Sequence, residues 1–224
     1  MKTKSVAHES APKTLRSVSI VGTGSYLPKR VLTNADLAKM MDTTDEWITT
    51  RTGIKERHIA AVDQATSDLA TEAARRALRQ AGLTAEDLDM IIVATVTPDM
   101  FFPSTACFVQ KAIGARKAVC FDLEAACSGF LFALETARQF VGSGAITTAL
   151  VIAADKLTAI TDWQDRSTCV LFGDGAGAAI VCSRPGVRGI IATAMASDGT
   201  LGHLLTMPGG GSRNPATAQT VNDR

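Results

Sequence analysis

The sequence has few aromatic residues, almost no net charge and no long apolar run, and each lack excludes a class of protein. Aromatic residues make up 5% of the 224 residues, and the formal net charge is +1. A near-neutral balance argues against a nucleic-acid surface. No apolar run approaches the roughly 18 residues of a membrane span, and the first fifteen residues lack the apolar centre of a secretory signal. We therefore expect a cytoplasmic globular protein with a disordered tail at 1–15.

The five cysteines show no spacing typical of a metal site or of a disulfide framework. Their number is odd and no two form a CxxC pair, so no bound metal is predicted. Four of them lie inside apolar or periodic segments and are interpreted as core packing: Cys107, Cys120, Cys169 and Cys182. The fifth, Cys127, has a different context.

Apolar runs alternate with amphipathic runs along the chain, which predicts an α/β protein. Strands are expected at 17–28, 90–96, 118–124, 147–155, 176–184 and within 188–199. Helices are expected from Asn34, over 66–82, over 104–114 and after Cys127. Asn34 and Ser67 are the expected N-caps, with Gly82 ending the second helix. Strands separated by helices of ten or more residues indicate a largely parallel sheet covered on both faces.

Cys127 lies between the strand at 118–124 and the helix that follows, within "LEAACSGFLF". A helix N-terminus stabilises a thiolate, which is the nucleophilic form of cysteine. Open α/β sheets bind ligands at the carboxyl ends of their strands, and the small neighbours of Cys127 leave room for a substrate. The residues alone leave a nucleophile and an inert cap-region cysteine equally open.

Three further features have both a functional and a structural interpretation. Trp47, in "DEWITTRTGI", could stack a planar base while Arg51 pairs with phosphate oxygens, or it could be a half-buried anchor on a surface helix. Arg166 could be a second cation or an ordinary loop charge. The run "FGDGAGA" at 172–178 leads into a strand rather than a helix, so it predicts tight backbone packing instead of a phosphate loop.

Several longer segments together resemble one known family. They are "GTGSYLP", "TNADL", "DEWITTRTGIKERHIA", "FPSTAC", "AACSGF", "DRSTCVLFGDGAGAA" and "DGTLGHLLTMPGGGSRNP", spread from Val18 to Asn214. They closely resemble β-ketoacyl-acyl-carrier-protein synthase III, the initiating condensing enzyme of type II fatty-acid synthesis. The resemblance implies a thiolase-like fold of layers α-β-α-β-α, of which mainly the N-terminal half is present.

The resemblance also implies roles for individual residues. Cys127 would take an acyl group from acyl-CoA, with its own N–H contributing to the oxyanion hole. Trp47 and Arg166 would hold the adenine of CoA between them, and Thr43 and Arg51 would help to hold the nucleotide end.

The acyl pocket would be formed by Phe102, Phe172 and Leu204. Phe102 would reach across a homodimer interface, and its bulk would favour a short primer such as acetyl. Acyl-CoA is a substrate, so no cofactor is implied, and malonyl-acyl carrier protein is the expected second partner.

The sequence departs from the family at its C-terminal end. The family draws a catalytic His and a catalytic Asn from the second half of its fold, and His8, His58 and His203 match neither position. We therefore expect a first-half domain over 16–185, and the start of a truncated second half over 186–224.

Three alternatives stay open at this point. One is a related acyl-CoA-primed synthase of the polyketide or quinolone type, and another is a non-catalytic remnant. A cysteine hydrolase is less favoured, because no histidine is placed to act as its base.

Overall fold

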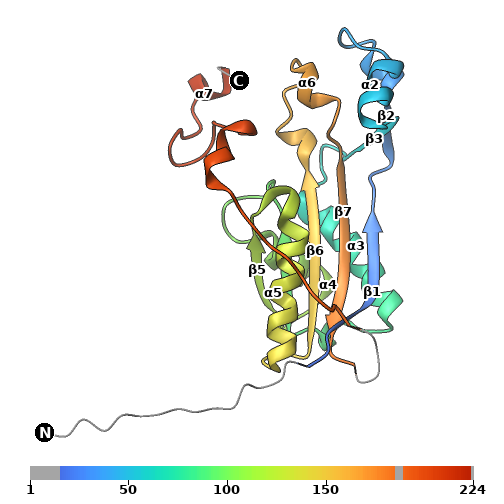
Figure 1. The fold of residues 1–224 in the computed structure, drawn as a ribbon, viewed down its shortest axis with the longest axis vertical. Coiled ribbons are helices and arrows are strands. Elements are labelled where there is room, and N and C mark those ends of the chain that lie inside the picture. Colours follow the sequence, from blue (N-terminus) through green and yellow to red (C-terminus); the bar gives the residue numbers. More distant parts are fainter. Residues whose placement is uncertain (1–15, 185–188, 223–224) are drawn as a thin grey trace, which may run out of the picture.

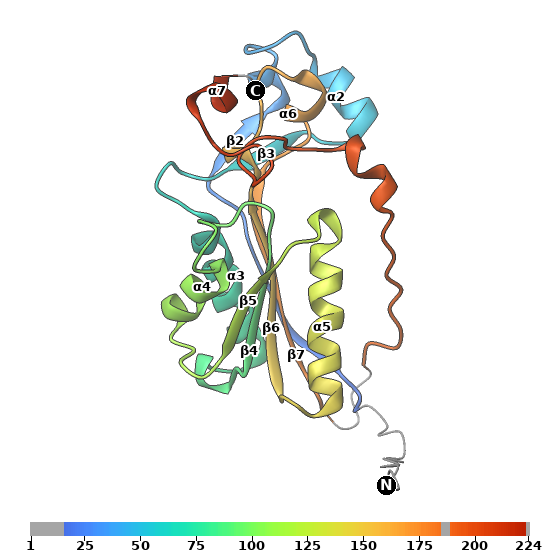
Figure 2. The same ribbon diagram turned by 90° about the vertical axis from the view of Figure 1, so that its left-hand side faces the viewer.

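The computed structural model describes residues 16–184 and 189–222, and the tail expected at 1–15 lies outside them. A central sheet separates two helical layers, as Figure 2 shows, with α3 and α4 on one face and α5 on the other. The three layers form the lower part of the molecule in Figure 1, and α2, α6 and a small sheet lie above one end of the strands. The expectation of an α/β sheet covered on both faces is confirmed.

The elements follow the predicted alternation. The strands are β1 (Ser19–Tyr26), β2 (Arg30–Thr33), β3 (Glu56–Ile59), β4 (Met90–Ala94), β5 (Val119–Leu123), β6 (Thr148–Lys156) and β7 (Asp174–Cys182). The α-helices are α1 (Asn34–Leu37), α2 (Asp45–Thr52), α3 (Thr66–Ala81), α4 (Thr105–Ile113), α5 (Gly129–Ser143), α6 (Arg166–Cys169) and α7 (Ala218–Asn222). Four short 3-10 helices complete the order within the described residues: η1 (Ala85–Asp87), η2 (Ala126–Ser128), η3 (Leu157–Ala159) and η4 (Gly199–Leu204).

The five-stranded sheet has the order β1-β7-β6-β4-β5. Strand β4 pairs in parallel with β5 and β6, whereas β7 pairs antiparallel with both β6 and β1. Four strands therefore run in one direction and β7 is reversed, because the 157–173 excursion brings the chain back at the end where β6 finished. The prediction of a largely parallel sheet is correct for the directions of those four strands and wrong for the two pairings of β7.

Two apolar cores lie on either side of this sheet. Strand β4 is buried along its whole length, as its continuous apolar run predicts. Helix α3 packs its predicted inner face, which includes Leu69, Ala73 and Ala77, into one core. Helix α5 contributes Ala133, Ala137 and Val141 to the other core. None of the helices in the described part of the chain is long and apolar enough to cross a membrane.

Three local predictions were wrong. The N-cap of α1 is Thr33, which forms a capping box with Asp36, and Asn34 is the first helical residue. The N-cap of α3 is Ala65, because the Ser67 hydroxyl donates to Asp99 at 2.6 Å instead. The strand expected within 188–199 is absent from its described residues: Ile190 donates one backbone hydrogen bond to Val18, just before β1, and the segment then crosses over α5 (Figure 1).

A small third core lies above the carboxyl ends of β1 and β6. Strands β2 and β3 form an antiparallel pair, against which α1, α2 and α6 gather. Its buried side chains are Leu32, Leu37, Ile48, Ile59, Cys169 and Val170. Trp47 packs against this core, and Arg166 is the first residue of α6.

Candidate acyl-transfer site

Three segments that carry predicted site residues leave the sheet at the same end. The segments with Trp47, Cys127 and Arg166 follow the carboxyl ends of β1, β5 and β6, respectively. These strands share one direction, so their carboxyl ends lie along one edge of the sheet, the usual place for a ligand site in α/β proteins. Figure 2 shows this arrangement, with α2 and α6 above the sheet at the end where α5 begins.

Cys127 lies at the predicted turn between strand and helix. Strand β5 ends at Leu123, the 3-10 turn η2 holds Cys127, and α5 begins at Gly129. Ala126, directly before the cysteine, has φ of 43°, a left-handed conformation that is uncommon for a residue with a side chain. The sharp turn presents Cys127 as an exposed residue.

The other four cysteines behave as the predicted core residues. Cys169 and Cys182 are buried, and Cys107 and Cys120 are half-buried. Burial raises the pKa of Cys120 to about 12 and also raises the pKa of Cys169, which keeps both as neutral thiols. Exposure therefore distinguishes Cys127 from the rest.

Close packing under the turn sets the position of the α5 N-terminus. A side chain at Gly129 would place its Cβ 3.1 Å from the Cβ of Ala94 on β4. The helix can therefore approach the buried central strand because residue 129 is glycine. Cys127 is carried two residues before this contact, at the start of the helix.

Two guanidinium groups lie against the ring of Trp47 on α2, one from the same helix and one from α6. The guanidinium carbon of Arg51 lies 4.6 Å from the ring centroid, and that of Arg166, on α6, lies 4.7 Å from it. Such contacts are attractive because the ring face is electron-rich. The structure thus brings together three of the four residues assigned to the nucleotide end.

The loop before α2 supplies the fourth residue and holds Arg166. Thr43 is buried, and its hydroxyl oxygen has no hydrogen-bond partner among the described residues. Arg166 donates to the Asp42 carbonyl at 2.6 Å, and its guanidinium lies 3.8 Å from the Asp42 carboxylate. Sequence reasoning missed Asp42, because a backbone acceptor leaves no signal in a residue pattern.

The glycine run at 172–178 packs as predicted. Strand β7 begins at Asp174, and a Cβ on Gly173 would lie 2.8 Å from the Cβ of Arg57. The run therefore lets the chain pass close to β3.

The three residues assigned to the acyl pocket are not among those that line a cavity formed by some of their neighbours in the sequence. Phe102 and Leu204 are 84% and 70% exposed, and Phe172 is half-buried. This cavity has a volume of about 660 Å³ and is lined by apolar side chains such as Phe101 and Met207 and by Lys156. It does not include Cys127, so the acyl-pocket assignment stays a prediction.

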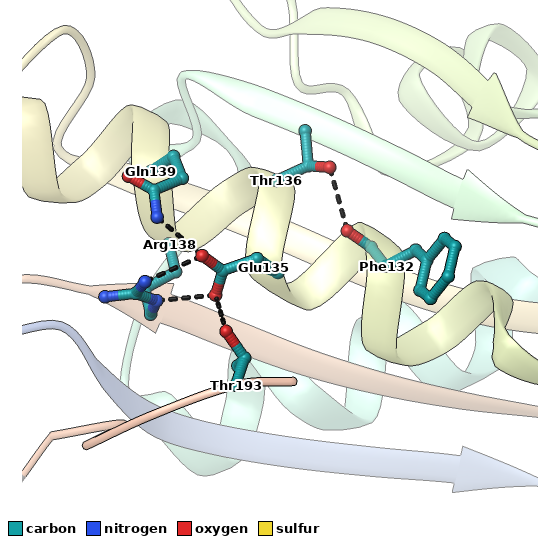
Figure 3. A network of polar contacts seen from close by, with 6 residues as sticks. All are labelled: Phe132, Glu135, Thr136, Arg138, Gln139 and Thr193. Carbon is teal, nitrogen blue, oxygen red and sulfur yellow. Dashed lines mark hydrogen bonds and ion pairs between the residues drawn. The ribbon is translucent and has the colours of Figure 1, made fainter. Parts of the chain in front are cut away.

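A polar network on α5 fixes the segment that follows β7. Arg138 donates to both carboxylate oxygens of the buried Glu135, at 2.6 and 2.7 Å, and Thr193 donates to one of them at 2.7 Å. Figure 3 shows Arg138 and Gln139 on one side of this carboxylate and Thr193 approaching from the neighbouring segment. The hydrogen bonds from Arg138 lower the pKa of Glu135 to about 2.

No group of three His, Cys, Asp or Glu side chains within 16–184 and 189–222 could hold a metal ion. The segments at this edge of the sheet carry a thiol, an indole, two guanidinium groups and a hydroxyl that has no partner among the described residues. This set suits a nucleophile beside a binding surface for an aromatic, anionic ligand.

Comparison with known proteins shows which family the chain resembles. Residues 121–199, which include Cys127 and Arg166, match the family described as 3-oxoacyl-[acyl-carrier-protein (ACP)] synthase III. The β-ketoacyl-[acyl-carrier-protein] synthase III of Caldanaerobacter subterraneus subsp. tengcongensis is 60% identical over 205 residues, which cover 92% of this chain and 62% of that protein. The chain thus spans less than two thirds of the length of this relative.

Solved structures show the same fold. The 3-oxoacyl-[acyl-carrier-protein] synthase III of Aquifex aeolicus is 55% identical and superposes with a TM-score of 0.80, over 82% of this chain and 59% of that one. The priming β-ketosynthase of a polyketide biosynthetic pathway is 39% identical, with a TM-score of 0.76 over 81% of this chain and 54% of that one.

Proposed function

We propose that this chain belongs to the β-ketoacyl-[acyl-carrier-protein] synthase III family over the part it spans, and that it carries the acyl-accepting site of a condensing enzyme. The observation that supports this most is the exposed Cys127 at the start of α5, at the same edge of the sheet as the Trp47, Arg51 and Arg166 cluster. Acyl-CoA is the proposed donor, and Cys127 is the proposed acceptor.

The first step is a thioester exchange. The Cys127 thiolate attacks the acyl carbonyl carbon, a new C–S bond forms, and the C–S bond to CoA breaks. CoA leaves as a thiolate and takes up the proton that Cys127 lost. Helix N-termini in general favour negative charge nearby, and α5, a helix of fifteen residues, begins two residues after Cys127.

The nucleotide end of CoA would lie on Trp47. A base between Trp47 and Arg166 needs about 7 Å between the two planar groups, twice the contact distance of carbon atoms. Arg166 now lies 4.7 Å from the ring centroid, so it must move outward by a few ångströms when the base enters. Thr43, whose hydroxyl has no partner in the described part of the chain, and Arg51 are the proposed partners for the polar groups of the nucleotide.

The second step belongs to the proposal for the whole protein. Acyl carrier protein is named in the relatives, so malonyl-acyl carrier protein is the proposed acceptor for decarboxylative condensation. We also propose that the whole protein is a homodimer and that its domain boundary lies between residues 185 and 186. The proposed acyl pocket is formed by Phe102, Phe172 and Leu204.

Titration calorimetry with CoA and with phosphopantetheine tests the nucleotide site, because the second ligand lacks the nucleoside. Stacking a base on an aromatic side chain contributes about 1–3 kcal/mol, so we expect CoA to bind about 5- to 150-fold more tightly. Trp47→Ala should abolish most of this difference. Thr50→Ala, on the exposed side of the same helix, is the matched control. Equal affinities of wild-type protein for both ligands would contradict the proposal.

The polyketide priming ketosynthase among the similar structures supports one alternative, an acyl-CoA-primed synthase with another acceptor. Product analysis of the whole protein with malonyl-acyl carrier protein and with malonyl-CoA separates the two. A product formed only from malonyl-CoA would favour the alternative.

A further inference from the structure

Asn34 and Arg57 are buried polar residues beneath the Trp47 cluster, and the acyl-transfer chemistry uses neither. Asn34 is 1% exposed and Arg57 is 4% exposed. They come from α1 and β3, which flank α2 along the chain.

Asn34 joins the two ends of α2. Its side-chain nitrogen donates to the carboxylate of Asp45, the first residue of the helix, at 2.7 Å. The same nitrogen donates to the carbonyl oxygen of Ile54, two residues after the helix ends, at 2.8 Å. One amide group therefore fixes both ends of the helix that carries Trp47 and Arg51.

Arg57 connects this amide to the second element of the cluster. It donates from Nη1 to the Asn34 side-chain oxygen at 2.6 Å and from Nη2 to the carbonyl oxygen of Val170. Val170 directly follows α6, the short helix that begins at Arg166. A continuous path of hydrogen bonds thus runs from α2 through Asn34 and Arg57 to α6.

No negatively charged group in the described part of the chain pairs with the Arg57 guanidinium, so stabilisation of the fold is a poor explanation for its burial. Its hydrogen-bond partners are neutral oxygens, and in the described part of the chain it forms no ion pair. Its Nε is buried without a partner in that same part. A protein with apolar side chains in place of buried charged groups of similar size is often at least as stable. A buried arginine here is better explained by the geometry of its planar fork, which can hold two acceptors at once.

We propose that Asn34 and Arg57 are positioning residues that set the separation of Trp47 and Arg166, and thereby the affinity for the nucleotide end of the acyl donor. This inference rests on the proposed function, because it assumes that CoA binds at Trp47. Neither residue touches the ligand; they act through α2 and α6.

The test compares Arg57→Met and Arg57→Lys with the wild-type chain, and Arg30→Met is the matched control. Arg30 is exposed and pairs with Ile59 in the same two-stranded sheet. For each variant, the affinities for CoA and phosphopantetheine are measured by calorimetry. The rates of Cys127 acylation by acetyl-CoA and by acetyl-phosphopantetheine are measured by mass spectrometry.

We expect Arg57→Met to lose at least about fivefold in affinity for CoA, with its affinity for phosphopantetheine unchanged. Acylation by acetyl-CoA at low concentration should slow by the same factor, and acylation by acetyl-phosphopantetheine should not change. Arg57→Lys can reach only one of the two oxygens and should recover part of the loss. Arg30→Met should behave as wild type.

Three results would overturn the inference. The first is that Arg57→Met keeps the wild-type preference for CoA over phosphopantetheine while Trp47→Ala loses it. The proposed function would then still hold. The second is an equal loss for both ligands in Arg57→Met and Arg57→Lys, which indicates a role in folding only. The third is a preference for CoA that Trp47→Ala retains, in which case the proposed nucleotide site itself is wrong.

Discussion

Replacing Glu135 with glutamine tests the polar network that ties the segment after β7 to α5. Glu135 is 6% exposed, and its carboxylate accepts hydrogen bonds from Arg138, Gln139 and Thr193. A glutamine offers one acceptor oxygen, and its amide nitrogen faces donors that it cannot satisfy. Glu135→Gln should therefore weaken both the Arg138 contact and the attachment of Thr193.

The lowered pKa of Glu135 gives the size of the expected loss in the free energy of unfolding. A carboxyl group whose pKa falls from 4.5 to about 2 on folding contributes about 3 kcal/mol to stability at neutral pH. Because the folded-state pKa is the lower one, this contribution is complete above about pH 5 and is lost as the pH falls toward 2. At pH 3 roughly half of it remains. We expect Glu135→Gln to lower the free energy of unfolding by about 2–3 kcal/mol at pH 7 and by about 1 kcal/mol at pH 3.

Urea unfolding at the two pH values measures both quantities. Glu72→Gln is the control, because Glu72 forms an ion pair with Arg75 of the same i,i+3 spacing, with both side chains more than 40% exposed. Exposed pairs contribute about 0–1 kcal/mol, so this variant should lie near wild type. A loss of stability in Glu135→Gln below about 0.5 kcal/mol at pH 7, or one equal at both pH values, would contradict a stabilising role of the Glu135 carboxylate.

Two further predictions concern the elements that hold the site. Gly24→Ala would place a Cβ 2.2 Å from the carbonyl oxygen of Ala73 on α3; we expect a loss of about 3 kcal/mol in chemical denaturation. Gly177→Ala, where a Cβ meets nothing within 4 Å, should stay within about 0.5 kcal/mol of wild type, and equal losses would contradict the steric argument. Thr44→Ala removes the side chain that accepts from the Trp47 N–H. Its expected cost is about 1 kcal/mol in the same assay, and an unchanged midpoint would exclude a capping role.

Local patterns predicted the elements that depend on local physics. The run at 90–96 is strand β4, buried on both faces, and the small residues of α3 form its inner face as their spacing indicates. The turn at Cys127 follows from an apolar strand, small residues and an amphipathic helix in that order. The cap at Thr33 could also have been found, since Thr33 and Asp36 have the spacing of a capping box.

Other features depend on contacts between distant residues, and no local pattern contains them. The reversal of β7 follows from the path of the 157–173 excursion, not from the strand itself. Ser67 is not a cap because Asp99, 32 residues away, accepts from it. The burial of Arg57 is hidden within a run of exposed charges, and its partner Val170 lies 113 residues along the chain.

The site residues also divide into those that the sequence identified and those that only the structure shows. The resemblance to the family identified Trp47, Arg51 and Arg166, and the structure brings them together. Neither Asp42 nor the path through Asn34 and Arg57 could be identified from residue types, because each works through a backbone carbonyl or a neutral amide.

The most direct test of the central claim is mass spectrometry of the 224-residue chain after incubation with acetyl-CoA. We expect one acetyl group, carried as a thioester on the peptide that contains Cys127. We also expect no acetylation of Cys127→Ala and full acetylation of Cys107→Ala, which removes a half-buried cysteine. Acetylation that persists in Cys127→Ala, or a wild-type Cys127 that stays unmodified while CoA is bound, would contradict the role of Cys127 as acyl acceptor.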